Sequence, residues 1–214
     1  MKTSAFAFLF LICISCNNDP AGKTEISGQG GIERLAIYYP LDSDRAGNKV
    51  YHKIPSVDLV AHDGNSFDPA SLQGNVIVSD FFFARCAGTC PLMAGQMTRI
   101  QAAFAGKKNL KLVSYSVDPE NDTVEVLQAY AQRFNADTEL WKFVTGEKKK
   151  IYELARKGFF LPVEPGTGDT EDFIHSDQLV LVDKQLHIRG YYNGTDSASV
   201  NDLIEDAQVL LNEK

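Results

Sequence analysis

The stretch NVIVSDFFFARCAGTCPLMAG, residues 75–95, joins a long apolar run to two cysteines and a proline. Residues 75–83 are almost continuously β-branched or aromatic, which is typical of a central strand buried on both faces of a sheet. A helix is expected next, because Pro91 suits a first helical position and apolar residues then recur every three or four positions, at Leu92, Met93, Met97, Ile100 and Phe104. Cys86 and Cys90 therefore lie between a buried strand and a helix.

The rest of the chain alternates between patterns typical of strands and of helices. Strands are predicted at 109–118, 140–146 and, as a pair joined near Asp183 and Lys184, at 178–194. Helices are predicted within 118–134, where the acidic residues are interpreted as caps with Asp122 or Thr123 at the start, and at 147–157 and 197–212. With two further strands expected at 34–40 and 57–64, this order predicts an α/β, thioredoxin-like fold: a central mixed sheet flanked by helices, with extra N-terminal strands.

The first residues, MKTSAFAFLFLICISCNND, are typical of a secretory signal, because Lys2 precedes an apolar run too short to span a bilayer core of about 30 Å as a helix. The run ends in CISC, which resembles a bacterial lipobox with Cys13 in place of the usual leucine. We predict a lipoprotein-type signal peptide at 1–15, lipidation at Cys16, a flexible tether at 16–31 and one folded domain at 32–214. Ordinary cleavage nearby is the alternative.

Composition limits the function classes that need to be considered. The chain has 214 residues, 44% of them hydrophobic and 23% charged, which fits one globular domain. Its formal charge of −7 repels a polyanion on average, so no nucleic-acid partner is expected. Of the four cysteines, Cys13 leaves with the signal and Cys16 carries lipid, so only Cys86 and Cys90 remain in a compartment where disulfides persist.

The cysteine pair, Cys86 and Cys90, could form a structural crosslink, a redox dithiol or part of a metal site. Because Pro91 disfavours helical geometry at Cys90, residues 86–90 are expected to form a loop beside the helix N-terminus, which favours thiolates. A disulfide closing so small a loop would restrict the unfolded chain little, so a structural crosslink is the weakest reading. Redox and metal chemistry stay open.

A metal site would need a third donor, since two thiolates suit Cu(I) but do not close even a low-coordinate site. His52, His62 and His187 lie in predicted strands, where a histidine is more often packed or solvated than a ligand. His175 differs, because it follows a glycine-rich acidic loop and directly precedes the strand at 178, where a thioredoxin-like chain returns beside its cysteine loop. Position alone leaves a ligand and a non-ligand role for it equally favoured, and Zn²⁺ would accept the same donors.

Three segments, FFFARCAGTCP (81–91), SVDPENDT (116–123) and FIHSDQLVLVDKQLHIRGYYNG (173–194), together resemble the Sco/SenC family. The resemblance covers roughly residues 50–212, and these proteins are thioredoxin-like copper chaperones for the binuclear copper centre of cytochrome c oxidase. It implies that Cys86, Cys90 and His175 bind copper, as Cu(I) or Cu(II). It also implies a partner, the copper-accepting subunit of the oxidase, and anchoring at a membrane, for which the lipobox candidate would supply a lipid here. The expected location is the bacterial cell envelope, facing the periplasm.

This chain departs from the family pattern at two positions. Ala87 stands where most members have proline after the first cysteine, so the loop is expected to be looser. Ile174 stands where many members have aspartate before the histidine, so the imidazole is expected to be less polarised, with Asp172 or Asp177 as candidate substitutes.

Asp80 supports a rival function. It interrupts the apolar strand six residues before Cys86, the spacing at which thioredoxins place a buried aspartate, and a buried carboxyl can exchange a proton with the deeper thiol. The alternative function is therefore an envelope thiol-disulfide oxidoreductase that keeps acceptor cysteines reduced. Asp80 could instead have no role in chemistry, with local hydrogen-bond donors that allow its burial. A peroxidase of the peroxiredoxin kind is disfavoured, because Arg85 and Thr89 alone do not reproduce its site.

Overall fold

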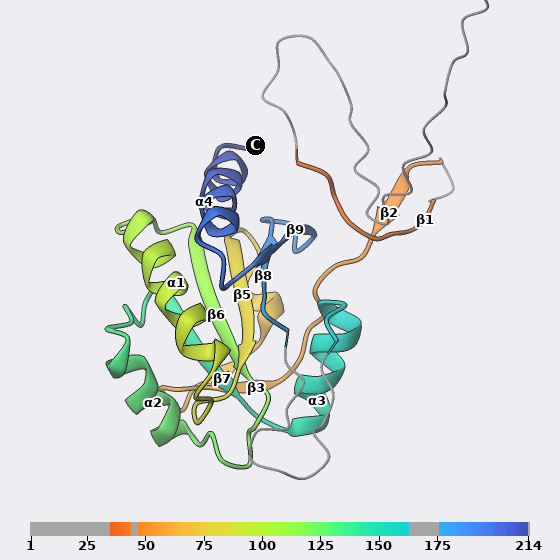
Figure 1. Cartoon of the computed structure of the whole chain (residues 1–214). Coiled ribbons are helices and arrows are strands. Elements are labelled where there is room, and N and C mark those ends of the chain that lie inside the picture. Colours follow the sequence, from red (N-terminus) through yellow and green to blue (C-terminus); the bar gives the residue numbers. More distant parts are fainter. Residues whose placement is uncertain (1–34, 44–46, 163–175, 214) are drawn as a thin grey trace, which may run out of the picture. The chain divides into compact units, whose positions relative to one another are not determined.

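The computed structural model describes residues 35–43, 47–162 and 176–213. A seven-stranded mixed sheet forms its centre, in the order β4-β3-β7-β6-β5-β8-β9 (Figure 1). Its strands are β3 (Leu59–Ala61), β4 (Ser66–Phe67), β5 (Val76–Phe82), β6 (Leu110–Ser116), β7 (Trp141–Thr145), β8 (Gln178–Val182) and β9 (Ile188–Asn193). A separate two-stranded sheet pairs β1 (Pro40–Ser43) with β2 (Lys49–Tyr51).

Helices connect and cover the strands, which gives the predicted mixed sheet with flanking helices. They are α1 (Thr89–Ala103), α2 (Val124–Arg133), α3 (Lys148–Glu153), which continues into the π-helical turn η2 (Leu154–Gly158), and α4 (Ser197–Asn212), with a short 3-10 helix η1 (Pro69–Leu72). Within the described residues, no helix is both long and apolar enough to cross a membrane.

β5 is the central strand, as predicted, and all seven of its residues are buried. It pairs in parallel with β6 and antiparallel with β8, and its side chains alternate between the two faces of the sheet. Phe82 packs against Tyr130 of α2 with ring centroids 4.9 Å apart, whereas Phe81 packs against Phe159, which follows η2, at 5.4 Å. Helical segments therefore cover both faces of β5.

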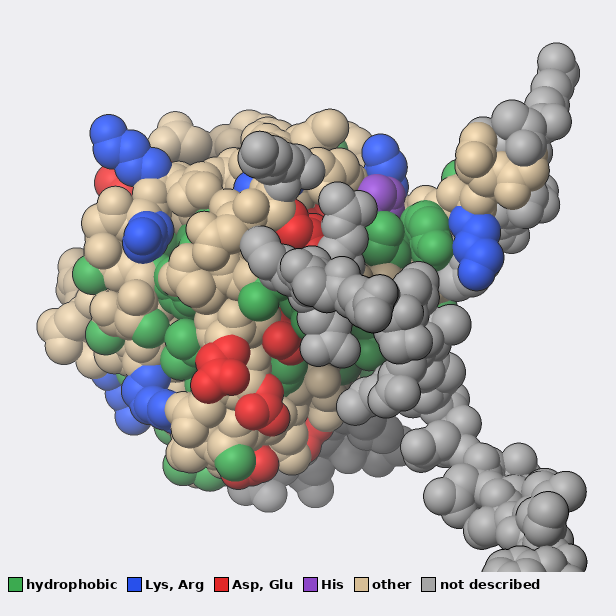
Figure 2. Space-filling model, turned by 90° about the horizontal axis from the view of Figure 1, so that it is seen from above, with side chains coloured by type: hydrophobic (Ala, Val, Ile, Leu, Met, Phe, Trp, Pro, Cys, Tyr) green, Lys and Arg blue, Asp and Glu red, His purple; other side chains and the backbone are tan. Residues whose placement is uncertain are grey.

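α1 and α4 lie side by side on the sheet (Figure 1), where polar side chains link them. Gln96 donates a hydrogen bond to Ser197 over 3.0 Å, and Arg99 donates one to Asn201 over 2.6 Å. Four residues of the predicted apolar stripe are buried, namely Met93, Met97, Ile100 and Phe104. The fifth, Leu92, was wrongly included, because it is 62% exposed. On the face of the molecule that Figure 2 shows, Asp and Glu side chains form a group, and Lys and Arg side chains are scattered around it.

α1 begins earlier than the sequence predicts. Cys90 is already helical, so the predicted loop at 86–90 is wrong at its end, and Pro91 occupies the third helical position rather than the first. The N–H groups of a first turn have no partner within the helix, so a proline there costs no hydrogen bond. Burial of Cys90, which is 1% exposed, outweighs the local preference of a residue that precedes proline.

The prediction of a strand at 34–40 is also wrong. Residues 35–39 belong to no strand, and β1, which begins at Pro40, pairs with β2 rather than with the central sheet. The Arg189 side chain donates hydrogen bonds to the backbone carbonyls of Leu35 and Ala36, over 2.6 Å and 3.1 Å, which supply partners that a neighbouring strand would otherwise provide. Tyr39 then has a left-handed φ of 56°, which interrupts the extended backbone. The segment expected at 57–64 is a strand only at β3, which turns back into β4.

The packing of α1 predicts a contrast between two substitutions in the same helix. Met97→Ala should lower the free energy of unfolding by about 2–5 kcal/mol, because Met97 is fully buried and its loss leaves a cavity. Leu92→Ala should change it by less than about 0.5 kcal/mol, because Leu92 is 62% exposed. Chemical denaturation measures both, and equal losses would contradict this packing.

Candidate functional site

The cysteine pair lies where β5 ends and α1 begins. Cys86 is half-buried in the connecting loop, whereas Cys90 is buried in the first turn of the helix, and no disulfide joins the two. Burial raises the pKa of the Cys90 thiol, a hydrogen bond with the backbone of Phe83 lowers it, and a hydrogen bond with the Cys86 thiol raises it again. At Cys90, burial therefore outweighs the thiolate-favouring effect that the helix N-terminus was expected to have.

Asp80 is buried on the same strand, 3% exposed, and belongs to a chain of hydrogen bonds through the core. Ser114 of β6 donates its hydroxyl to Asp80 Oδ1 over 2.5 Å, and the Trp141 indole donates to Ser114 Oγ over 2.9 Å. Burial raises the pKa of Asp80 to about 7, although the Ser114 hydrogen bond lowers it in part. The charge of Asp80 in turn raises the pKa of Cys90, which links the two groups electrostatically.

The acidic segment after β6 has a role that sequence reasoning missed. Asp122 Oδ2 accepts a hydrogen bond from the Ala84 backbone N–H over 3.0 Å, and Asp118 Oδ2 accepts one from Arg85 Nε over 2.8 Å. Interpretation of this segment purely as helix capping is wrong, because Thr123 alone caps α2, through Val126 N–H at 3.4 Å. The available signal was the position of these acids beyond the carboxyl end of a predicted strand.

Three histidines have packing partners, in agreement with their interpretation as structural residues. His52 Nε2 lies 2.8 Å from the Gly158 carbonyl, and His62 Nδ1 accepts a hydrogen bond from a backbone N–H over 3.3 Å. His187 Nδ1 lies 3.4 Å from a carboxylate oxygen of Asp183. Burial lowers the pKa of His62.

His175 and Cys16 lie outside the described residues, and so do the predicted signal peptide and tether at 1–31. The chain resumes at Ser176, just before β8. In the antiparallel pairing of β8 with β5, Val180 lies opposite Ser79, so Gln178 begins its strand at the carboxyl end of β5. Among the residues that the structure does describe, no three His, Cys, Asp or Glu side chains are grouped so that they could hold a metal ion.

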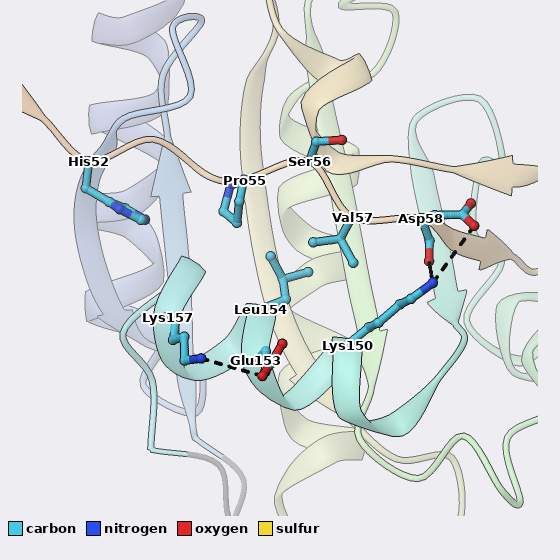
Figure 3. Close-up of a pocket in the computed structure, with 9 residues that line it drawn as sticks. All are labelled: His52, Pro55, Ser56, Val57, Asp58, Lys150, Glu153, Leu154 and Lys157. Carbon is cyan, nitrogen blue, oxygen red and sulfur yellow. Dashed lines mark hydrogen bonds and ion pairs between the residues drawn. The ribbon is translucent and has the colours of Figure 1, made fainter.

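A groove of ≈ 540 Å³ lies between the extended segment 52–58 and the α3–η2 helix (Figure 3). Its floor is apolar, with Pro55, Val57 and Leu154. The charged groups at its rim are paired with neighbours, since Lys150 lies 4.0 Å from Asp58 and Lys157 lies 3.5 Å from Glu153. Neither cysteine lines this groove, so it is distinct from the candidate site.

Two solved structures with 28–29% identity share this architecture. A SCO1/SenC family lipoprotein from Bacillus anthracis str. Ames superimposes with a TM-score of 0.69 at 29% identity, covering 83% of this chain and 100% of that chain. BsSco, a member of the Sco family of cytochrome c oxidase assembly proteins in which a disulfide switch was identified, gives 0.68 at 28% identity, covering 83% and 99%.

A more distant structure shares the fold alone: Bradyrhizobium japonicum ScoI with copper bound has a TM-score of 0.62 at 17% identity, covering 73% of this chain and 98% of that chain. The sheet with its flanking helices is thus the thioredoxin-like fold of the Sco proteins, as predicted.

Sequence comparison agrees with the fold. The SCO1 protein homolog of Bacillus subtilis (strain 168) is 32% identical over 148 residues, which are 68% of this chain and 76% of that protein. The SCO1/SenC family model matches residues 46–211, a span that includes both cysteines, Asp80 and His175. The chain therefore belongs to the SCO1/SenC family.

Proposed function

We propose that this protein binds copper and delivers it to the binuclear copper centre of cytochrome c oxidase during assembly of the enzyme. The observation that carries the proposal is the position of two reduced cysteines just beyond the carboxyl end of β5. The neighbouring strand β8 begins at the same end of β5, three residues after His175 in the sequence. His175 is the residue directly before Ser176 in the sequence. The oxidase-assembly role stated for the family of BsSco supports the same function.

In the proposed mechanism copper is cargo rather than a resident cofactor. Cys86 and Cys90 lose their protons and supply two thiolates, and the His175 imidazole supplies a third, neutral donor. Three donors leave the ion open to attack by a ligand of the acceptor subunit, which can bond before a donor of this chain leaves. Cu(I) keeps its oxidation state throughout, so transfer needs no electron donor.

A protein held at the membrane surface would stay close to an oxidase in the same membrane. We propose that Cys16 carries a lipid and that residues 16–31 connect the lipid to the folded domain on the periplasmic side. The description of the Bacillus anthracis relative as a lipoprotein supports this anchor.

A specific observation favours a second candidate function, a thiol-disulfide oxidoreductase that keeps acceptor cysteines reduced. Asp80 is a buried carboxyl with a pKa of about 7, electrostatically linked to Cys90. A group that titrates near neutral pH can accept the proton of the deeper thiol as that thiol attacks a mixed disulfide, and later return it. Both candidate functions need the reduced pair, so they are compatible.

Competition for Cu(I) against a coloured chelator tests the copper site. Cys86→Ser, Cys90→Ser and His175→Ala should each weaken binding by more than about a hundredfold, because loss of even an outer-sphere partner of a metal ligand costs about 10- to 100-fold. His187→Ala is the matched control and should leave affinity unchanged, since this ring lies against Asp183. Wild-type affinity in His175→Ala would refute the three-donor site.

The titration of Asp80 should be visible in stability. Its pKa of about 7 in the folded protein lies above the ordinary value of 3.8, so the folded state keeps a proton that the unfolded chain releases. This contribution is complete below pH ~4 and is lost as pH rises to ~7, by about 1.4 kcal/mol per pH unit and about 4 kcal/mol in all.

Denaturation of Asp80→Asn between pH 4 and 8 checks this expectation, because an amide at this position does not titrate. Its free energy of unfolding relative to wild type should increase as pH rises through that window. Asp202→Asn, an exposed change in α4, should show a constant difference from wild type. A constant difference for Asp80→Asn as well would mean that Asp80 does not titrate there.

Single-turnover reduction of a disulfide-bonded peptide by the reduced protein tests the second function. Asp80→Asn should slow the reaction about 100-fold or more, the usual scale of lost acid–base catalysis. Copper affinity should stay at the wild-type value in the same variant. Equal rates for wild type and Asp80→Asn would remove the argument for reductase chemistry.

A further inference from the structure

Two residues between β5 and Cys86 are held by carboxylates from another part of the chain. The Ala84 backbone N–H donates to Asp122 Oδ2 over 3.0 Å, and the Arg85 side chain donates to Asp118 over 2.8 Å. Ser116 donates its hydroxyl to the same oxygen of Asp122 over 2.6 Å. The backbone that leads into the first cysteine is therefore fixed from the segment that follows β6.

The position of Asp122 is costly unless it serves these contacts. It is 1% exposed, and burial raises its pKa, although the hydrogen bonds from Ser116 and Ala84 and the charge of Arg85 oppose this effect. A buried carboxylate needs such donors to offset its loss of water. Thr123 already caps α2, so capping does not account for a carboxylate at 122.

The hydrogen bond donated by the Ala84 N–H restrains the loop that carries Cys86, the cysteine whose position is more adjustable. Cys90 is fixed within α1, whose neighbouring residues Met93 and Met97 are fully buried. Cys86 is half-buried and belongs to the loop, so the distance between the sulfurs depends on where the loop places it. Ala84 lies two residues before Cys86, at the start of that loop.

We propose that Asp122 is a positioning residue that holds Cys86 in the dithiol geometry, which can take a metal, and opposes formation of the Cys86–Cys90 disulfide. The hydrogen bond from Ala84 is present while both cysteines are in the reduced, thiol state. A disulfide holds the two sulfurs at about 2.05 Å and accepts only a narrow range of Cα and Cβ separations, so its formation depends on where the loop places Cys86 relative to α1. The inference rests on the proposed function only in taking Cys86 and Cys90 as the reactive pair.

The reaction that reports this effect is exchange with a small disulfide. When oxidised glutathione is the oxidant, a bond forms between the two Sγ atoms and the glutathione disulfide bond breaks. Two electrons and two protons pass from the cysteine pair to glutathione, giving two glutathione thiols. The equilibrium constant of this exchange compares the dithiol and the disulfide directly.

Redox titration of the full chain in glutathione buffers tests the proposal, with wild type, Asp122→Asn and Asp68→Asn. Asp122→Asn keeps an acceptor oxygen but loses its charge, so its hydrogen bond with the Ala84 N–H should weaken. Formation of the Cys86–Cys90 disulfide should then become about tenfold more favourable, which makes the midpoint potential of the pair about 30 mV more negative. Asp68→Asn is the matched control, because this carboxylate also accepts from a hydroxyl and from backbone N–H groups, but at η1. Its potential should equal that of wild type.

An unchanged potential in folded Asp122→Asn would overturn the positioning role. If that variant does not fold, Ser116→Ala removes the other donor to Asp122 and should shift the potential in the same direction, with an unchanged value again overturning the proposal. The measurement uses no copper. Failure of the wild type to bind Cu(I) would therefore refute the proposed function and leave this result standing.

Discussion

The candidate site depends on the burial of β5 between a parallel and an antiparallel neighbour. Because β6 runs parallel to β5, the acidic segment that follows Ser116 leaves the sheet at the edge where the cysteine loop leaves. Because β8 runs antiparallel, its first residue, Gln178, lies at that same edge. Three segments separated by up to about a hundred residues in sequence thus approach one another as a consequence of strand direction, before any side chain of the site makes a contact.

Burial at this edge also sets its chemistry. Asp80 and Cys90 are both enclosed, and in a medium of low dielectric each favours its neutral form. A cation that binds the sulfur pair changes this balance, because its charge compensates the thiolates as their protons leave. Disulfide formation removes the thiolates altogether. Metal binding and oxidation are thus two ways in which a buried thiol pair avoids an uncompensated negative charge.

Local patterns were sufficient to predict the parts of the fold in which one residue type repeats. The apolar run of β5 and the stripe of α1 were found because burial fixes their periodicity. The predicted start of α1 was wrong, because burial of Cys90 in the tertiary structure overrides the local effect of Pro91 on the residue before it. The contacts of Asp118 and Asp122 were missed because they span more than thirty residues, and a helix cap explained the same letters locally. The spacing of Cys86 and Cys90 singled them out, and the resemblance to Sco/SenC proteins added His175 as an expected third ligand. Neither carried information about what holds the cysteine loop.

The presence of Asp80 bears on which chemistry the site performs. An apolar residue in a central strand would avoid the cost of burying a carboxyl, and Asp80 recovers part of that cost through the hydrogen bond from Ser114. Copper binding alone does not call for a proton acceptor beside the deeper thiol, because a metal ion itself displaces the proton of its ligand. Disulfide exchange does call for one, since Cys90 must lose its proton with no cation present. The presence of Asp80 therefore supports the proposed thiol-disulfide chemistry in addition to the proposed copper binding, because this carboxyl could accept the proton that a bound metal would otherwise displace.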